Sequence, residues 1–175
     1  MCAMKSLADL VAALPEGVVV TDPAQTEKYR HDWSHDAAAG WPLAVVRAET
    51  ADHVQAAMRW AAAHRVPVVP RGAGSGLSGG ATAVEGGLVV SLERMRAIEI
   101  DPATRVATVE PGAFNAEVKA AAAAHGLWYP PDPSSYEICS IGGNIATNAG
   151  GLCCVKYGVT TDYVLGMDVV LADGT

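Results

Sequence analysis

Apolar and polar positions in the first ninety residues follow two patterns, helical spacing and short continuous apolar runs. Helical spacing occurs after Ser6, which forms a capping-box pattern with an acidic residue three positions later, and again after Thr50, a good N-cap residue. Runs typical of buried strands occupy residues 43–47, 66–69 and 88–92. The order strand, helix, strand predicts a β-α-β unit that ends directly at a glycine-rich loop.

Two further signals predict a short helix and a hairpin. Asp22 and Pro23 form an N-cap and first-turn pair, so we expect a helix over residues 24–29. In the second half of the chain the pattern becomes antiparallel, because strand-like runs at 97–101 and 105–109 flank a short Asp-Pro-Ala-Thr turn.

The last third of the chain combines one more helix, a stiff bend and an apolar run. Helical spacing over 114–122 predicts a helix, and Gly126 stands where a C-cap glycine belongs. Prolines within 130–133 predict an extended bend. Residues 167–172 are apolar enough for a strand, and the Asp-Gly pair after them is half of a hairpin signal. Because the partner strand would follow, we expect the chain to be a fragment of a longer protein.

The most informative segment is the glycine-rich loop after the run at 66–69. Its glycines stand at positions 72, 74, 76, 79 and 80. Backbone without Cβ atoms can turn through positive φ and bring N–H groups close to a phosphate. The spacing from Gly74 to Gly79 is the G-x-G-x-x-G of a Rossmann site, and Glu99 imitates its ribose-binding acid. The segment after Gly79 leads into the run at 88–92, however, and a Rossmann fingerprint must open a helix.

We therefore predict a phosphate-binding loop between two strands. Arg71 would supply a fixed cation, and Ser75 and Ser78 would supply hydroxyl donors. A simple chain reversal is the alternative, although a reversal needs only roughly two to five residues with one or two glycines. The predicted contact residues are Pro70, Arg71, Gly72, Ala73, Gly74, Ser75, Gly76 and Ser78.

A second glycine-rich segment spans residues 140–151. Paired glycines beside Ser, Asn and Thr permit close approach and offer amide or hydroxyl hydrogen bonds to a flat polar ring system. The alternative is a helix N-terminus packed tightly against a neighbour. The candidate contact residues are Ser140, Gly142, Gly143, Asn144, Thr147 and Gly151, and Pro131 and Asp132 could border the same cavity.

The amino-acid composition argues against several classes of function. Of 175 residues, half are apolar and 18% are charged, which is typical of a globular domain. The net charge of −7, with no Lys/Arg cluster, argues against nucleic acid as a partner. No apolar run approaches the roughly 20 residues that span a bilayer, and the N-terminus does not resemble a secretory signal. We expect a cytoplasmic protein, with peripheral membrane association left open.

Catalytic and metal-binding constellations are not visible in the sequence. The five histidines do not follow metal-ligand spacing, and no Ser/His/Asp or Cys/His set can be assembled. Cysteines stand at 2, 139, 153 and 154; we interpret them as reduced thiols, and the adjacent pair as packing residues rather than nucleophiles. The residues therefore indicate a nucleotide-cofactor domain with two glycine-rich contact segments and no acid/base machinery of its own.

Four motifs, in this order along the chain, resemble those of a known protein family. They read PRGAGSGLSGGA, PGAFNAEVKAAAAAHGLWYPPDPSS, SIGGNIATNAGG and KYGVTTDYVLGMDVVLADG. Over residues 41–175 the chain resembles the FAD-binding (PCMH-type) domain of the p-cresol methylhydroxylase/vanillyl-alcohol oxidase superfamily. Within it, the chain is most similar to the branch that holds the D-type subunit of glycolate oxidase and the FAD-linked D-lactate dehydrogenases.

The resemblance implies an α+β fold of two α/β subdomains with FAD between them. An N-terminal helical segment would cover 1–37 and the FAD-binding domain 38–175. Its first subdomain would span about 38–96, and its second, incomplete at the C-terminus, about 97–175. Residues 70–78 would hold the pyrophosphate, and the second segment with Pro131 and Asp132 would contact the ribityl chain and isoalloxazine.

In this family a 2-hydroxy acid gives hydride to the flavin while an enzyme base takes its hydroxyl proton. The resemblance leaves the electron acceptor open, and it places the catalytic residues and any metal site beyond Thr175. Members with covalent flavin commonly carry a His in the glycine loop, where this chain has Ser75, so we expect non-covalent FAD. An alkyl-glycerone-phosphate synthase, an aryl-alcohol oxidase or a truncated, non-catalytic flavin-binding fragment are the alternatives.

Overall fold

The computed structural model describes residues 2–175, with side chains from Leu7 onward. The chain has an α+β fold that divides into two compact units. Unit 1 comprises Met1–Arg94 and Asp168–Thr175, and unit 2 comprises Met95–Met167. The division follows Arg94, whereas the sequence predicted a boundary after residue 96 and placed the last eight residues in the second subdomain.

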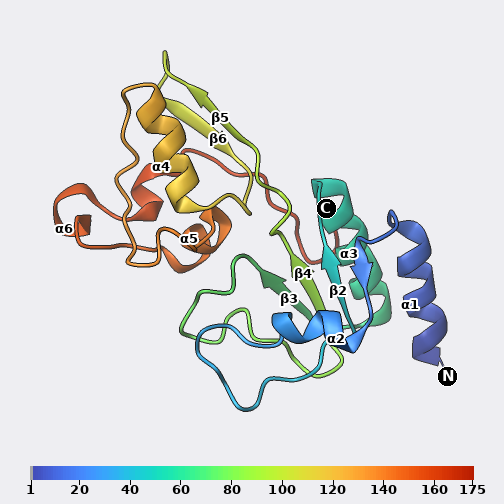
Figure 1. Ribbon diagram of the computed structural model, residues 1–175. Helices are drawn as coiled ribbons and strands as arrows, with labels where there is room; N and C mark the ends of the chain where they lie inside the picture. The colour runs from blue at the N-terminus through green and yellow to red at the C-terminus, as the bar shows by residue number, and fades with distance from the viewer. Residues whose placement is uncertain (1) are drawn as a thin grey trace. The chain divides into compact units, whose positions relative to one another are not determined.

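Unit 1 is built on a four-stranded sheet (Figure 1). Its order is β1 (Val19–Val20), β2 (Ala44–Arg47), β4 (Leu88–Ser91) and β3 (Val68–Arg71). The last three are parallel, and β1 is antiparallel to β2. The expected β-α-β unit is confirmed, but β4 lies between the two strands of that unit.

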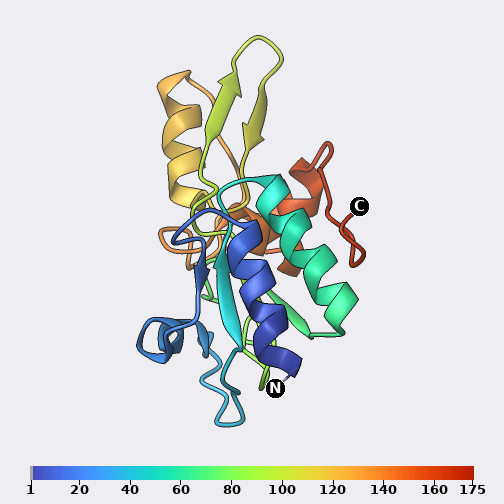
Figure 2. The ribbon, with the colours of Figure 1, turned by 90° about the vertical axis from the view of Figure 1, so that its right-hand side faces the viewer.

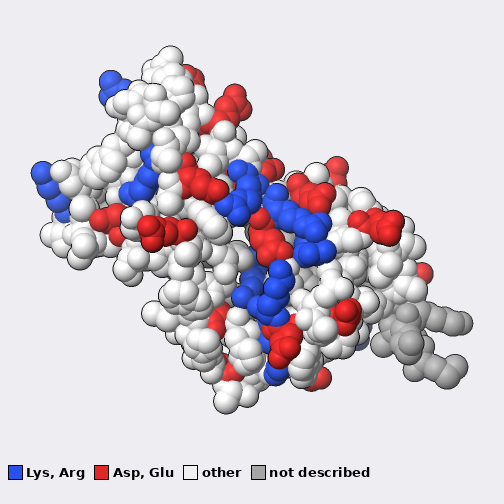
Figure 3. All heavy atoms as spheres, in the orientation of Figure 1, with Lys and Arg blue, Asp and Glu red and all other residues white. Residues whose placement is uncertain are grey.

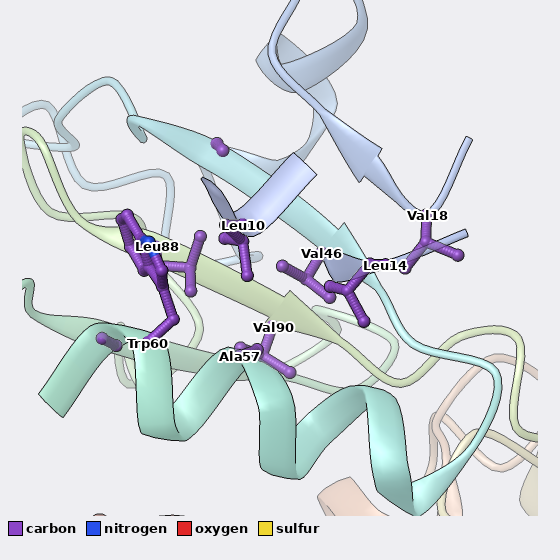
Figure 4. Packing of buried hydrophobic residues seen from close by; sticks show 10 residues of the cluster. Leu10, Leu14, Val18, Val46, Ala57, Trp60, Leu88 and Val90 are labelled. Carbon is purple, nitrogen blue, oxygen red and sulfur yellow. The ribbon is translucent and has the colours of Figure 1, made fainter. Parts of the chain in front are cut away.

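Two helices, α1 (Cys2–Ala13) and α3 (Ala51–His64), lie side by side on one face of this sheet (Figure 2). Their apolar sides meet the sheet in one cluster, to which Leu10, Trp60, Val46 and Leu88 contribute (Figure 4). Full burial of each such side chain contributes about 1.5–3 kcal/mol. The sheet and its two helices therefore form the main core of unit 1.

The expected N-cap residues are found in two of three cases. Thr50 Oγ1 accepts a hydrogen bond from His53 N at 3.3 Å, and Asp22 caps α2 (Pro23–Thr26) by accepting from Ala24 N. The 3-10 helix η1 (Glu27–Tyr29) continues α2. Ser6 was predicted to cap the first helix, which is wrong, because that helix begins at Cys2 and Ser6 lies inside it.

Unit 2 combines a two-stranded sheet with short helices (Figure 1). The predicted hairpin is confirmed: β5 (Ile98–Asp101) pairs antiparallel with β6 (Val106–Val109). Helix α4 (Asn115–Ala124) packs on both strands and ends before Gly126, whose φ is +69°. The remaining elements are α5 (Ile141–Thr147), α6 (Cys154–Tyr157) and the 3-10 helix η2 (Thr160–Tyr163).

The strand predicted at residues 167–172 does not form, and this prediction is wrong. Within the described part of the chain this segment pairs with no strand; Leu171 N donates to Thr175 O at 2.8 Å in a local turn. A strand needs a neighbour for its backbone N–H and C=O groups, so apolar content alone was insufficient. Met167, Val169 and Leu171 are each more than half exposed.

Charged side chains of both signs are interspersed on the face shown in Figure 3. Among the side chains from Leu7 onward, Arg94 pairs with Glu49 in unit 1, at 2.6 Å, and Arg96 pairs with Glu117 in unit 2, at 2.5 Å. In the described part of the chain, no helix combines the length and the apolar character needed to cross a bilayer.

Candidate functional site

The glycine-rich loop connects β3 to β4 without a helix. Between the end of β3 at Arg71 and the start of β4 at Leu88 the structure contains only turns, bends and irregular backbone. This confirms the prediction of a loop between two strands. The loop therefore lacks the helix N-terminus on which a Rossmann site depends.

The backbone N–H groups of this loop form a row without partners. Among the residues that the structure describes, none accepts a hydrogen bond from the N–H groups of Gly74 to Gly80. Backbone donors in folded proteins are nearly always paired with protein, water or ligand. Three residues of this loop, Gly74, Ser75 and Gly79, are buried or half-buried. The seven consecutive N–H groups are therefore suited to bind an anion.

Arg71 lies buried beneath the loop and binds its backbone. Its guanidinium is therefore less available to a ligand than the sequence indicated. Its guanidinium is buried and donates to four backbone carbonyls. Nη1 donates to Ala81 O at 3.0 Å and Tyr29 O at 3.4 Å. Nη2 donates to His31 O at 2.9 Å and Lys28 O at 3.4 Å. Burial lowers the pKa of Arg71, although nearby acidic groups oppose this.

Glycine is required at two loop positions and not at two others. Gly74 and Gly79 have φ of +72° and +77°, and a Cβ on Gly74 would overlap the Arg71 guanidinium. Gly76 and Gly80 have no such φ. The nearest atom to a Cβ on Gly76 would be Asp32 Oδ2 at 3.9 Å, and nothing lies within 4 Å at Gly80. The fold itself would accept a side chain at these two positions.

The remaining predicted loop residues lie as follows: Pro70 is exposed in β3, Gly72 and Ala73 are half-buried, and Ser78 is exposed. Ser75 is half-buried. Sequence reasoning missed Asp32, whose carboxylate accepts hydrogen bonds from Ala81 N and Thr82 Oγ1 at the end of the loop. The D-x-S spacing of an Asx turn at 32–34 was the available signal.

The second glycine-rich segment forms α5 and the bend after it, in unit 2. Ile141 N and Gly142 N donate to the carbonyls of Ala113 and Pro111. A Cβ on Gly142 would lie 2.8 Å from Pro111 Cβ, and one on Gly151 would overlap the Asp132 carbonyl. These glycines are explained by tight packing inside the unit, which is the alternative that the sequence left open.

Asn144 is buried and engaged within unit 2. Its Oδ1 accepts from Asn115 Nδ2 at 3.1 Å, and its Nδ2 donates to Cys139 Sγ at 3.1 Å. Asn115 Nδ2 also donates to the carbonyl of Pro131 at 3.3 Å. This buried polar cluster orients the backbone on which α5 begins, so Asn144 and Pro131 hold the segment rather than presenting their polar groups to a ligand.

The other residues of the second segment differ in exposure. Gly143 is half-buried, and Thr147 is exposed with its Oγ1 donating to Gly143 O at 3.0 Å. Ser140 is buried. The two candidate segments belong to different units.

Asp132 is coupled to Cys153. Asp132 Oδ1 accepts from Cys153 N at 3.2 Å. A hydrogen bond from the Cys153 thiol is the main cause that lowers the pKa of Asp132, and the same bond raises the pKa of Cys153. Cys139, Cys153 and Cys154 are free thiols. In the part of the chain described by the structure, no three His, Cys, Asp or Glu side chains are placed to hold a metal ion.

Comparisons with known proteins identify the family of this chain. The family model described as FAD binding domain matches residues 42–175. Glycolate oxidase subunit GlcD of Bacillus subtilis is 47% identical over 146 residues, which cover 81% of this chain and 31% of that protein. D-2-hydroxyglutarate dehydrogenase of Xanthomonas citri pv. viticola is 43% identical over 166 residues, 94% of this chain and 35% of that protein.

A solved structure shows the same fold. The crystal structure of Phl p 4, a grass pollen allergen with glucose dehydrogenase activity, matches with a TM-score of 0.83 and 25% identity over 97% of this chain and 37% of that chain. The chain spans about a third of the length of the curated relatives it matches. Because the family model covers well over half of the chain, the chain belongs to the FAD binding domain family.

Proposed function

We propose that residues 70–80 bind the pyrophosphate of FAD through backbone N–H groups. The observation that carries this proposal is the row of unpartnered donors from Gly74 to Gly80. Gly76 supports it, because nothing in the fold requires glycine there, and backbone without a Cβ lets a phosphate come close to the N–H groups. Side-chain hydroxyls of Ser75 and Ser78 add donors, while Arg71 maintains the loop from within.

The flavin end of the cofactor would be contacted by the second segment. Gly143 and Thr147 are the members with accessible groups, and Asp132 is half-buried beside Gly151. In this proposal Ser140, Gly142, Asn144, Gly151 and Pro131 act chiefly by fixing the backbone. The chain's own part is binding and orientation, and we assign no proton-transferring group to it.

The whole protein is proposed to be an FAD-linked oxidoreductase that oxidises a 2-hydroxy acid of the glycolate or D-lactate type. When bound, FAD supplies the hydride acceptor for this chemistry. Support comes from the relatives, whose names specify glycolate and D-2-hydroxyglutarate, both 2-hydroxy acids. We also propose a cytoplasmic location, in keeping with three free thiols.

Non-covalent attachment of FAD is part of the proposal. Ser75 provides no ring nitrogen for a histidyl bond. Hydrogen bonding to Asp132 raises the pKa of Cys153, and Cys139 is buried against Asn144, so neither thiol is activated as a nucleophile.

The test is to purify the whole protein, of which this chain supplies the FAD-binding part, record the flavin absorbance band, and add glycolate or D-lactate without oxygen. Bleaching of the band by a 2-hydroxy acid supports the proposed activity, and an aryl alcohol serves as the control substrate. A bound flavin that only the aryl alcohol bleaches would favour an aryl-alcohol oxidase. Absence of flavin after reconstitution with FAD would contradict the proposed cofactor site.

A further inference from the structure

We propose that Asp32 is the positioning residue that fixes the glycine loop in its anion-binding shape. This inference rests on the proposed function, because it concerns the loop that would receive the pyrophosphate. Asp32 lies in the segment after η1, about forty residues before the loop, and it is almost fully buried at 1% exposure.

Both carboxylate oxygens of Asp32 are engaged. Oδ1 accepts from Ser34 N at 2.9 Å and from Ser34 Oγ at 2.6 Å, which makes a tight Asx turn. Oδ1 also accepts from Thr82 Oγ1 at 3.2 Å, and Oδ2 accepts from Ala81 N at 3.4 Å. One side chain therefore joins its own turn to the point where the glycine loop ends.

Arg71 fixes the start of the same loop and also contacts its end. It stands at the end of β3, where the loop begins, and its guanidinium binds the carbonyls of Lys28, Tyr29 and His31. Residues 28–34 thus form a template for the loop. Arg71 holds the start of the loop and also its end, where Nη1 donates to Ala81 O at 3.0 Å, and Asp32 adds the hydrogen bonds from Ala81 N and Thr82 Oγ1 at that same end. Gly74 lies over the guanidinium and Gly76 over the carboxylate, since these are the nearest groups to a Cβ at each position.

Asp32 acts through shape rather than by touching the ligand. An anion above Gly76 would be repelled by a carboxylate beneath it, so the charge of Asp32 opposes the binding that its position supports. Burial alone would raise the pKa of Asp32. The hydrogen bonds from Ser34, Ala81 and Thr82 outweigh burial and lower it, so the carboxylate stays ionised as an acceptor at neutral pH.

The test compares two Asp32 variants with a matched control. Asp32→Ala removes every acceptor, whereas Asp32→Asn keeps Oδ1 for Ser34 and Thr82, removes the charge, and replaces Oδ2, the acceptor of Ala81 N, by an amide donor. Asp36→Ala is the control, because Asp36 makes the same kind of turn, with Oδ1 accepting from Ala38 N at 2.8 Å, without touching the loop. The readouts are the Kd values of FAD and of ADP, measured by calorimetry, and hydrogen exchange of the amides of Ala81 and Thr82, which are hydrogen-bonded to Asp32 and to Gly79 O.

We expect Asp32→Ala to raise both Kd values at least about tenfold. The loop loses several hydrogen bonds, and their combined free energy is larger than the free-energy change that a tenfold change in Kd represents. Exchange at Ala81 and Thr82 should accelerate while exchange in α4 of unit 2 stays unchanged. Asp32→Asn should give Kd values between those of wild type and Asp32→Ala, because it keeps the bonds from Ser34 and Thr82 and loses the one from Ala81 N, and Asp36→Ala should match wild type.

Failure of the inference is distinguishable from failure of the proposed function. A wild-type protein that binds neither FAD nor ADP would overturn the proposed function, and the inference with it. A wild type that binds FAD while Asp32→Ala binds equally well would overturn the positioning role alone. Accelerated exchange throughout both units in Asp32→Ala, or an Asp32→Asn as weak as Asp32→Ala, would also overturn it.

Discussion

The two glycine-rich segments look alike in sequence but use glycine for different reasons. In unit 2, Gly142 and Gly151 are pressed against Pro111 and the Asp132 carbonyl, so the fold itself excludes a side chain. In unit 1, Gly76 and Gly80 meet no such neighbour. A glycine that the fold does not require is better evidence of a binding role than one that it does, because the structure leaves the absence of a side chain unexplained.

The largest effect expected from this comparison is at Gly151. Gly151→Ala places a Cβ against a backbone carbonyl, which cannot rotate away, so we expect a loss of about 3 kcal/mol, at the upper end of overpacking effects. Thermal unfolding by circular dichroism measures it. Gly150→Ala is the neighbouring control; its Cβ would meet the Val159 side chain at 2.9 Å, which can shift, so the loss should be smaller. Equal melting temperatures for wild type and Gly151→Ala would show that the fold does not require glycine at position 151.

Gly76→Ala should separate binding from stability. We expect its melting temperature to stay within about 2 °C of wild type, because the space for a Cβ is open, while the Kd of FAD rises at least about tenfold. Gly166→Ala is the matched control, since that glycine also has open space and lies outside the loop. If Gly76→Ala binds FAD as tightly as wild type, a glycine that the fold does not require is no evidence of a binding role.

An acid titration of stability tests how far the glycine loop of unit 1 depends on Asp32. The folded-state pKa of Asp32 is lowered, so its contribution to stability is present above the ordinary aspartate value of 3.8 and is lost as the pH falls through the folded value. We expect wild type to lose stability more steeply than Asp32→Asn below pH 3.8, as followed by tryptophan fluorescence. Identical acid slopes for the two proteins would show that the loop does not depend on this carboxylate.

The smallest effect is expected at the cysteines of unit 2. Acid precipitation should release all FAD into the supernatant, and Cys153→Ser should leave FAD content unchanged, because the thiol is protonated and bonded to Asp132. Absorbance of the supernatant and in-gel fluorescence measure this. Flavin that stays with the denatured wild-type band but leaves with Cys153→Ser would establish a cysteinyl bond.

Local sequence signals predicted most elements because the forces behind them are local. Thr50 and Asp22 cap the helices that follow them, and the turn between β5 and β6 sets an antiparallel hairpin. The loop between β3 and β4 was predictable because the residues after Gly79 oppose a helix. The strand at 167–172 failed, since strand formation depends on a partner that the apolar pattern does not encode.

Tertiary contacts account for what the sequence did not reveal. Whether Arg71 faces a ligand or the carbonyls of residues 28–31 depends on how a distant segment folds beneath it. The demand for glycine at 151 comes from Asp132, nineteen positions away in the chain. Asp32 showed only a turn pattern, and its contacts with Ala81 and Thr82 span about fifty residues.

The link from β3 to β4 joins two parallel neighbours, a task for which proteins ordinarily use a helix that satisfies its own backbone. Here residues 72–87 make that crossover as irregular chain, and the donors of Gly74 to Gly80 find no acceptor within it. Cofactor binding is then linked to folding: a ligand present at a hundred times its Kd adds about 2.7 kcal/mol to native-state stability. In a cell, the fraction of this protein that escapes proteolysis would rise and fall with the flavin supply.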